Sequence, residues 1–201
     1  MMAKVVQFPV TPPAKLGPQK ARRKRKPNLE DFGQLNLFNQ ASEGKVRQLQ
    51  DDNYFELAMK MDEDNNAEAE RYYLLAINSG QSVGDAHCNL GILYSNQGAF
   101  PKAIDHLSKC LQLNPRHFEA HYNLGNVYSE VGNYALAKTH YQVAIEIAPE
   151  FPNSHYNLAL VLISDKAYEG AQKHLEKYIV LSPGFDHGVA KDLLKTLESF
   201  N

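Results

Sequence analysis

Hydrophobic residues recur at helical spacing through most of the chain. Leu90 and Tyr94 lie four residues apart, as do Leu124 and Tyr128, so each pair falls on one face of a helix. A short polar turn containing glycine follows each of these runs, and a second run with helical periodicity then ends at a proline. The pattern predicts units of two helices joined by a tight turn, each unit stopped by proline.

The same pattern returns every 34 residues. Three copies place their first helices over residues 85–91, 119–125 and 153–159, and the offset is kept downstream. The repeated columns include alanines (Ala103, Ala137, Ala171), prolines (Pro115, Pro149, Pro183) and small residues in the first helix (Gly91, Gly125, Ala159). A small side chain at that last column lets the two helices of a unit approach closely.

These columns resemble the tetratricopeptide repeat, whose period is 34 residues. The resemblance covers about residues 51–201 and implies an all-α fold. We expect a right-handed solenoid of antiparallel helix–turn–helix repeats, with a C-terminal capping helix and a disordered N-terminal tail. The expected segments are a basic tail (1–27), a linker that could carry a short helix (28–50), an irregular repeat 1 (51–83), repeats 2 to 4 (84–117, 118–151, 152–185) and a capping helix (186–201).

The resemblance also indicates a binding surface, because in this family the first helices line a concave groove. It places three asparagines at 34-residue spacing in that groove, and an amide can pair with any extended backbone since it both donates and accepts. Such a row resembles the groove of the repeat domain in O-linked N-acetylglucosamine transferases. The alternative is that these amides only satisfy neighbouring backbone groups. The candidate groove residues are Asn89, Tyr122, Asn123, Asn126, Tyr156 and Asn157.

Charge is distributed unevenly behind a net value of −2. Residues 1–27 hold eight of the 21 lysines and arginines and no acidic residue, which leaves 13 cations against 23 carboxylates in the rest. Five prolines and few large apolar residues make residues 1–27 a segment expected to be disordered. The acidic repeats favour a neutral or basic extended peptide as the ligand.

Two features before the repeats suggest a rival function. The run Arg22, Arg23, Lys24, Arg25 and Lys26 could contact nucleic acid weakly or serve as a nuclear localisation signal, or it could be only a solubilising tail. The segment Gln34, Leu35, Asn36, Leu37 and Phe38 resembles the bacterial sliding-clamp-binding pentapeptide, and its alternative is a short amphipathic helix packed on repeat 1. The rival hypotheses are therefore a factor associated with nucleic acid or the clamp, and a structural protein that self-associates.

Catalytic and metal functions are not expected from the sequence. No phosphate-binding glycine loop, zinc-protease motif or nucleophile elbow is present, so we predict a protein that is not an enzyme and needs no cofactor. The column His87, His121 and His155 is interpreted as interhelix spacers, and Cys88 and Cys110 as small apolar fillers, with no metal site. No apolar run approaches 18 residues, which favours a cytoplasmic protein, or a nuclear one in a eukaryote.

Overall fold

The computed structural model describes residues 15–21, 53–184 and 186–199. Within these ranges the chain forms nine α-helices and no strand. They are α1 (Tyr54–Glu63), α2 (Ala69–Asn78), α3 (Val83–Asn96), α4 (Phe100–Leu113), α5 (Phe118–Glu130), α6 (Tyr134–Ile147), α7 (Pro152–Ser164), α8 (Tyr168–Leu181) and α9 (Gly188–Glu198). The basic run 22–26, the linker 28–50 and the pentapeptide 34–38 lie outside the described residues.

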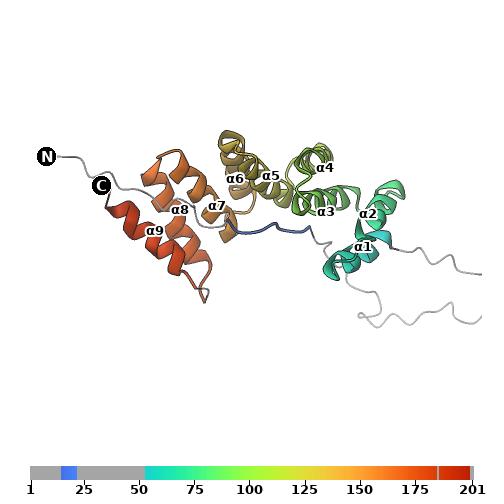
Figure 1. Ribbon diagram of the computed structural model, residues 1–201, viewed down its shortest axis with the longest axis horizontal. Coiled ribbons are helices and arrows are strands. Elements are labelled where there is room, and N and C mark those ends of the chain that lie inside the picture. Colours follow the sequence, from blue (N-terminus) through green and yellow to red (C-terminus); the bar gives the residue numbers. More distant parts are fainter. Residues whose placement is uncertain (1–14, 22–52, 185, 200–201) are drawn as a thin grey trace, which may run out of the picture.

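Consecutive helices pack as antiparallel pairs, α1 with α2, α3 with α4, α5 with α6 and α7 with α8. Among the first helices, α3 contacts α5 and α5 contacts α7, and α9 packs on α8 as the cap. Figure 1 shows the pairs stacked side by side into an elongated solenoid. The predicted all-α, right-handed solenoid of helix–turn–helix repeats is confirmed. None of the described helices is both long and apolar enough to cross a membrane.

The small-residue column sets how closely the two helices of a repeat approach. A Cβ atom built on Gly91 would lie 2.7 Å from Leu107 Cγ, and one on Gly125 would lie 2.5 Å from Tyr141 Cε1. Both distances are shorter than any normal carbon–carbon contact, so a side chain here would force the helices apart. The small residues of this column are therefore needed for the close packing of the two helices, as the sequence pattern predicted.

A left-handed residue ends the first helix of each repeat. Gly98 (φ 72°) and Gly132 (φ 76°) occupy this turn in repeats 2 and 3. The corresponding residues in repeats 1 and 4 are Asn65 (φ 52°) and Lys166 (φ 59°). Glycine adopts this conformation without steric cost and asparagine tolerates it, whereas lysine does so at a cost.

The histidine column bridges the two helices of each repeat. Each residue predicted as a spacer contacts a second histidine through their Nδ1 atoms, and the pairs are His87–His106 (2.9 Å), His121–His140 (3.0 Å) and His155–His174 (2.9 Å). His121 Nε2 also lies 3.1 Å from the carbonyl oxygen of Pro115. A carbonyl only accepts, so Nε2 of His121 carries the proton, and His140 must donate from Nδ1 within its pair.

Candidate functional site

The three asparagines of the repeat column lie on adjacent first helices. Asn89 on α3, Asn123 on α5 and Asn157 on α7 are all buried, with exposed fractions of 0, 2 and 1%. Residues 15–21 of the same chain run along these helices as an extended segment, drawn in blue in Figure 1. We call the surface formed by α3, α5 and α7 beneath this segment the groove, and residues 15–21 the docked segment.

Each asparagine makes a paired contact with one backbone unit of the docked segment. The side-chain oxygen accepts from the backbone N–H of a residue while the side-chain nitrogen donates to the carbonyl of that same residue. The pairs are Leu16 with Asn157 (2.7 and 2.9 Å), Gln19 with Asn123 (2.9 and 2.6 Å) and Ala21 with Asn89 (2.9 and 3.1 Å). The docked segment therefore runs against the order of the repeats and is held through main-chain atoms.

Tyr122 adds a further contact to the backbone of the docked segment. Its hydroxyl lies 2.8 Å from the carbonyl oxygen of Leu16 and 2.7 Å from that of Gly17. Complete burial raises the pKa of the Tyr122 phenol, so the hydroxyl keeps its proton. It donates to these carbonyls and accepts from Asn157 Nδ2 at 3.1 Å.

Asn126 orients the groove without a side-chain bond to the docked segment. Its Oδ1 atom accepts from the Tyr141 hydroxyl at 2.7 Å and from Asn157 Nδ2 at 2.9 Å. The N–H of Leu16 fixes the Asn157 amide with its oxygen toward the segment, so Asn157 Nδ2 must face Asn126. This fixes the Asn126 amide in turn, and its nitrogen points away from Asn157.

Two ion pairs hold the ends of the docked segment. Lys15 Nζ lies 2.9 Å from Glu130 Oε1 and also donates to the backbone carbonyl of Asn126. Lys20 Nζ lies 2.7 Å from Asp62 Oδ2, a carboxylate that is only 9% exposed and that also accepts from the Tyr73 hydroxyl at 3.0 Å. A carboxylate therefore lies near each end of the docked segment, Glu130 on α5 within the groove and Asp62 on the neighbouring α1.

The predicted groove residues differ in how they meet the docked segment. The three asparagines contact it directly, and Tyr122 contacts it through its hydroxyl. The Tyr156 ring instead packs on Tyr178 with centroids 4.9 Å apart. The sequence pattern did not reveal Lys15, Lys20 and their carboxylates, because each pair is far apart in the chain and no local motif marks it.

A buried cluster of two cysteines and a histidine lies outside the groove, and its members are far apart in the sequence. Potential ligand atoms of Cys88, Cys110 and His117 lie within 4.8 Å of one another, and all three residues are buried. Hydrogen bonds from Cys88 and His117 lower the pKa of Cys110 to about 6, against the effect of burial. Burial lowers the pKa of His117, but hydrogen bonds with Asp85, Cys110 and Glu119 raise it to about 11. The cluster joins the two helices of repeat 2 to His117, the residue that caps the start of α5, where the sequence predicted only apolar fillers.

Comparisons with known proteins agree with this architecture. Residues 84–117 and 118–151 match the tetratricopeptide repeat family model, so the chain contains tetratricopeptide repeats. MamA from Desulfovibrio magneticus RS-1 (residues 41 to the end) is 25% identical, with a TM-score of 0.60 over 73% of this chain and 88% of that one. A comparison with curated protein sequences gives no significant match.

Two further solved structures share the fold at lower identity. YrrB, described as a tetratricopeptide repeat protein with an unusual peptide-binding site, is 20% identical, with a TM-score of 0.63 over 73% of this chain and 75% of that one. The first tetratricopeptide domain of Spaghetti (RPAP3), solved with the HSP90 peptide SRMEEVD, is 19% identical, with a TM-score of 0.54 over 58% of this chain and 91% of that one. At these identities the likeness concerns the fold alone.

Proposed function

We propose that the chain is a non-catalytic protein-interaction adaptor whose groove holds an extended peptide of a partner protein. The observation that carries this proposal is the paired hydrogen bonding of Asn89, Asn123 and Asn157 to the backbone of the docked segment. Three buried amides with unpaired donors and acceptors would be costly, so the groove needs an extended backbone whenever it is dry. The docked segment supplies one, and a partner peptide would use the same atoms.

The charges at the groove favour a basic partner. Glu130 and Asp62 pair with lysines of the docked segment that are five residues apart in sequence. A partner peptide with lysine or arginine at the same spacing would keep both ion pairs, whereas a peptide rich in carboxylates would be repelled. An acidic peptide such as the one bound by the RPAP3 domain is therefore a poor ligand for this groove.

The docked segment is then an internal competitor for the partner. Because it is tethered to the repeats, it meets the groove at a high effective concentration, commonly in the millimolar range for flexible tethers. A partner must displace it, so binding should strengthen when the segment is weakened. The groove can therefore be exposed in the full chain by replacing Lys15 and Lys20 with glutamate. Each substitution turns an ion pair into a repulsion between two carboxylates.

The test uses the full chain carrying Lys15→Glu and Lys20→Glu, which we call the open-groove variant. A fluorescent peptide with the sequence of residues 14–21 is titrated against it, and binding is read as fluorescence anisotropy. We expect saturable binding that weakens at least tenfold when Asn123→Ala is added, because two hydrogen bonds to the peptide backbone are lost. Circular dichroism checks that the helices remain.

A matched asparagine outside the groove provides the control. Asn78 is exposed at the end of α2, so Asn78→Ala in the open-groove variant should leave peptide affinity unchanged. Equal loss in both variants would indicate a general effect of the substitutions. Unchanged binding with Asn123→Ala would overturn the groove as the peptide site.

A further inference from the structure

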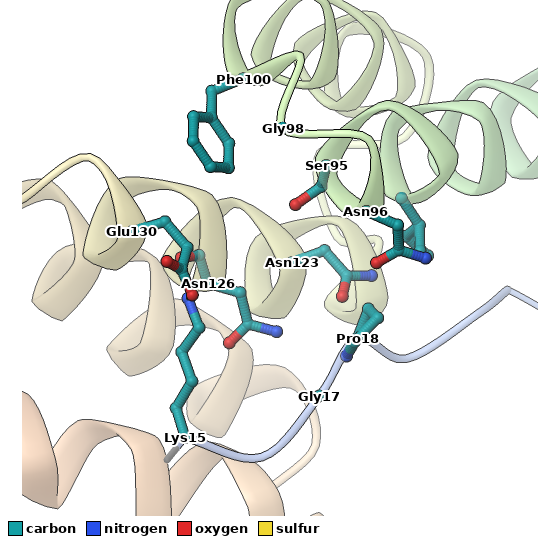
Figure 2. Close-up of a pocket in the computed structure, with 11 residues that line it drawn as sticks. Lys15, Gly17, Pro18, Ser95, Asn96, Gly98, Phe100, Asn123, Asn126 and Glu130 are labelled. Atoms are coloured by element: carbon teal, nitrogen blue, oxygen red, sulfur yellow. The ribbon is translucent and has the colours of Figure 1, made fainter. Parts of the chain in front are cut away.

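A cavity of about 470 Å³ lies beside the docked segment, between α3 and α5. Its wall includes Gly17 and Pro18 of the segment, Ser95 and Asn96 of α3, and Asn126 and Glu130 of α5. Figure 2 shows these side chains arranged around the space over the segment, with Asn126 and Asn123 projecting from α5 toward it. Where the docked segment borders this cavity it has Gly17, a residue without a side chain to fill the space.

One polar atom in this cavity wall has no partner among the described residues. Asn126 is only 5% exposed, and its Nδ2 atom is buried without a hydrogen-bond acceptor. The orientation of this amide is set by the chain of bonds through Asn157 to the Leu16 N–H. Exchanging its oxygen and nitrogen would break the bond from Asn157 Nδ2 and set two N–H donors against each other, although the Tyr141 hydroxyl could accept in place of donating. A buried N–H donor of this kind calls for an acceptor.

The docked segment leaves room for a side chain that could supply the acceptor. A Cβ atom built on Gly17 meets no described atom within 4 Å, and its backbone is not in the left-handed region. Pro18 follows, which favours an extended conformation at this position for any residue. A residue other than glycine therefore fits at this position of the cavity wall.

We propose that this cavity is a side-chain subsite of the groove, and that the partner peptide fills it with an uncharged amide side chain where the docked segment has Gly17. The inference rests on the proposed peptide-binding function. The carbonyl of a glutamine or asparagine would accept from Asn126 Nδ2, and its NH₂ would face the polar groups of Ser95 and Asn96. This contact gives the partner an advantage that the docked segment lacks.

Other side-chain classes fit the cavity wall less well. A carboxylate would approach Glu130, whose negative charge lies on the same wall. An ammonium group would present donors to the Asn126 donor, and Glu130 is already paired with Lys15. A hydrocarbon would leave Asn126 Nδ2 buried and unpaired. An amide is the class that both supplies an acceptor and carries no charge.

The test is a peptide series against the open-groove variant, in which Asn126 is unaltered. Four labelled peptides of the sequence of residues 14–21 carry glycine, leucine, glutamine or lysine at the Gly17 position. We expect the glutamine peptide to bind about tenfold tighter than the size-matched leucine peptide, the effect of one good hydrogen bond in a buried site. The lysine peptide should be the weakest of the three with long side chains.

A substitution at Asn126 that reverses the preference among the peptides tests directly whether this residue recognises the side chain. Asn126→Asp keeps an oxygen to accept from Tyr141 and Asn157 but replaces the Nδ2 donor by a second acceptor. In that background the lysine peptide should become the tightest binder, and the advantage of glutamine over lysine should reverse. A reversal of this kind is not produced by a general loosening of the groove.

The outcomes separate the two proposals. If no peptide in the series binds, the proposed peptide-binding function fails. If all four peptides bind with equal affinity and lose it with Asn123→Ala, the groove holds a peptide but the amide subsite is overturned. If leucine binds as tightly as glutamine and both exceed glycine, the cavity accepts side chains by size alone and the role of Asn126 is overturned.

Discussion

Replacing Gly125 with alanine tests the link between helix packing and the groove. The new Cβ would lie 2.5 to 3.0 Å from three ring atoms of Tyr141. That ring cannot easily move, because Tyr141 is fully buried and its hydroxyl donates to Asn126 Oδ1 at 2.7 Å. Asn126 in turn accepts from Asn157, which holds the backbone of the docked segment.

Opposing effects of known size decide whether Gly125→Ala raises or lowers the free energy of unfolding. Alanine gains up to about 1 kcal/mol over glycine in a helix interior. Overpacking a tight core costs about 1–3 kcal/mol, and the loss of the Tyr141 hydrogen bond to Asn126 adds about 0.5–1.5 kcal/mol. We therefore expect Gly125→Ala to lower the free energy of unfolding by about 1–3 kcal/mol, and to lower the melting temperature by several degrees.

The assay is urea denaturation followed by circular dichroism, with hydrogen exchange of the Leu16 amide as a local readout. Gly84→Ala in α3 is the control, since a Cβ there meets no described atom within 4 Å; it should be neutral or slightly stabilising. Gly125→Ala should also speed exchange of the Leu16 amide, because Asn157 loses its orienting partner. A Gly125→Ala chain as stable as the parent would refute the argument, since Tyr141 would then move at no cost.

Three further predictions concern single contacts. Tyr122→Phe should speed hydrogen exchange of the docked segment, because the bonds to the Leu16 and Gly17 carbonyls are lost. It should leave the urea midpoint nearly unchanged, because the one other bond lost is from Asn157 Nδ2, which keeps its bonds to Leu16 and Asn126. Lys166→Gly should raise the free energy of unfolding by up to about 1 kcal/mol, because lysine holds a φ of 59° there. The urea midpoint should rise accordingly, and a lower midpoint would contradict this. Burial, and then His121, lower the pKa of His140 from 6.5 to about 4, so the unfolded chain binds more protons and stability should fall as pH drops from about 6.5 toward 4. His140→Gln should flatten that part of a urea-midpoint profile, and an unchanged slope would count against it.

Part of the candidate site could be predicted because it repeats. Asn89, Asn123 and Asn157 recur at the repeat period, so helix geometry alone places them on one surface. The sequence also carries a second repeated signal, since His106, His140 and His174 keep the same 34-residue spacing. That spacing predicts a second histidine column, and the packing of the two helices of each repeat brings it against the first.

Contacts that occur once could not be predicted in this way. Lys15 meets Glu130, and Cys88 meets Cys110 and His117, only because the solenoid brings distant segments together. No column repeats these residues, so neither periodicity nor local spacing marks them. The same holds for the docked segment, whose proline-rich composition predicted a disordered tail.

The sequence by itself determined the repeat, the helix pairs and the asparagine row, because these depend on local spacing and on a small residue at each close approach. Only the tertiary structure decided that residues 15–21 lie in the groove and that a cavity remains beside Gly17. The physical reason is that a short, polar segment buries too little apolar surface to order itself. Its order comes from main-chain hydrogen bonds to amides that the solenoid has already set in place.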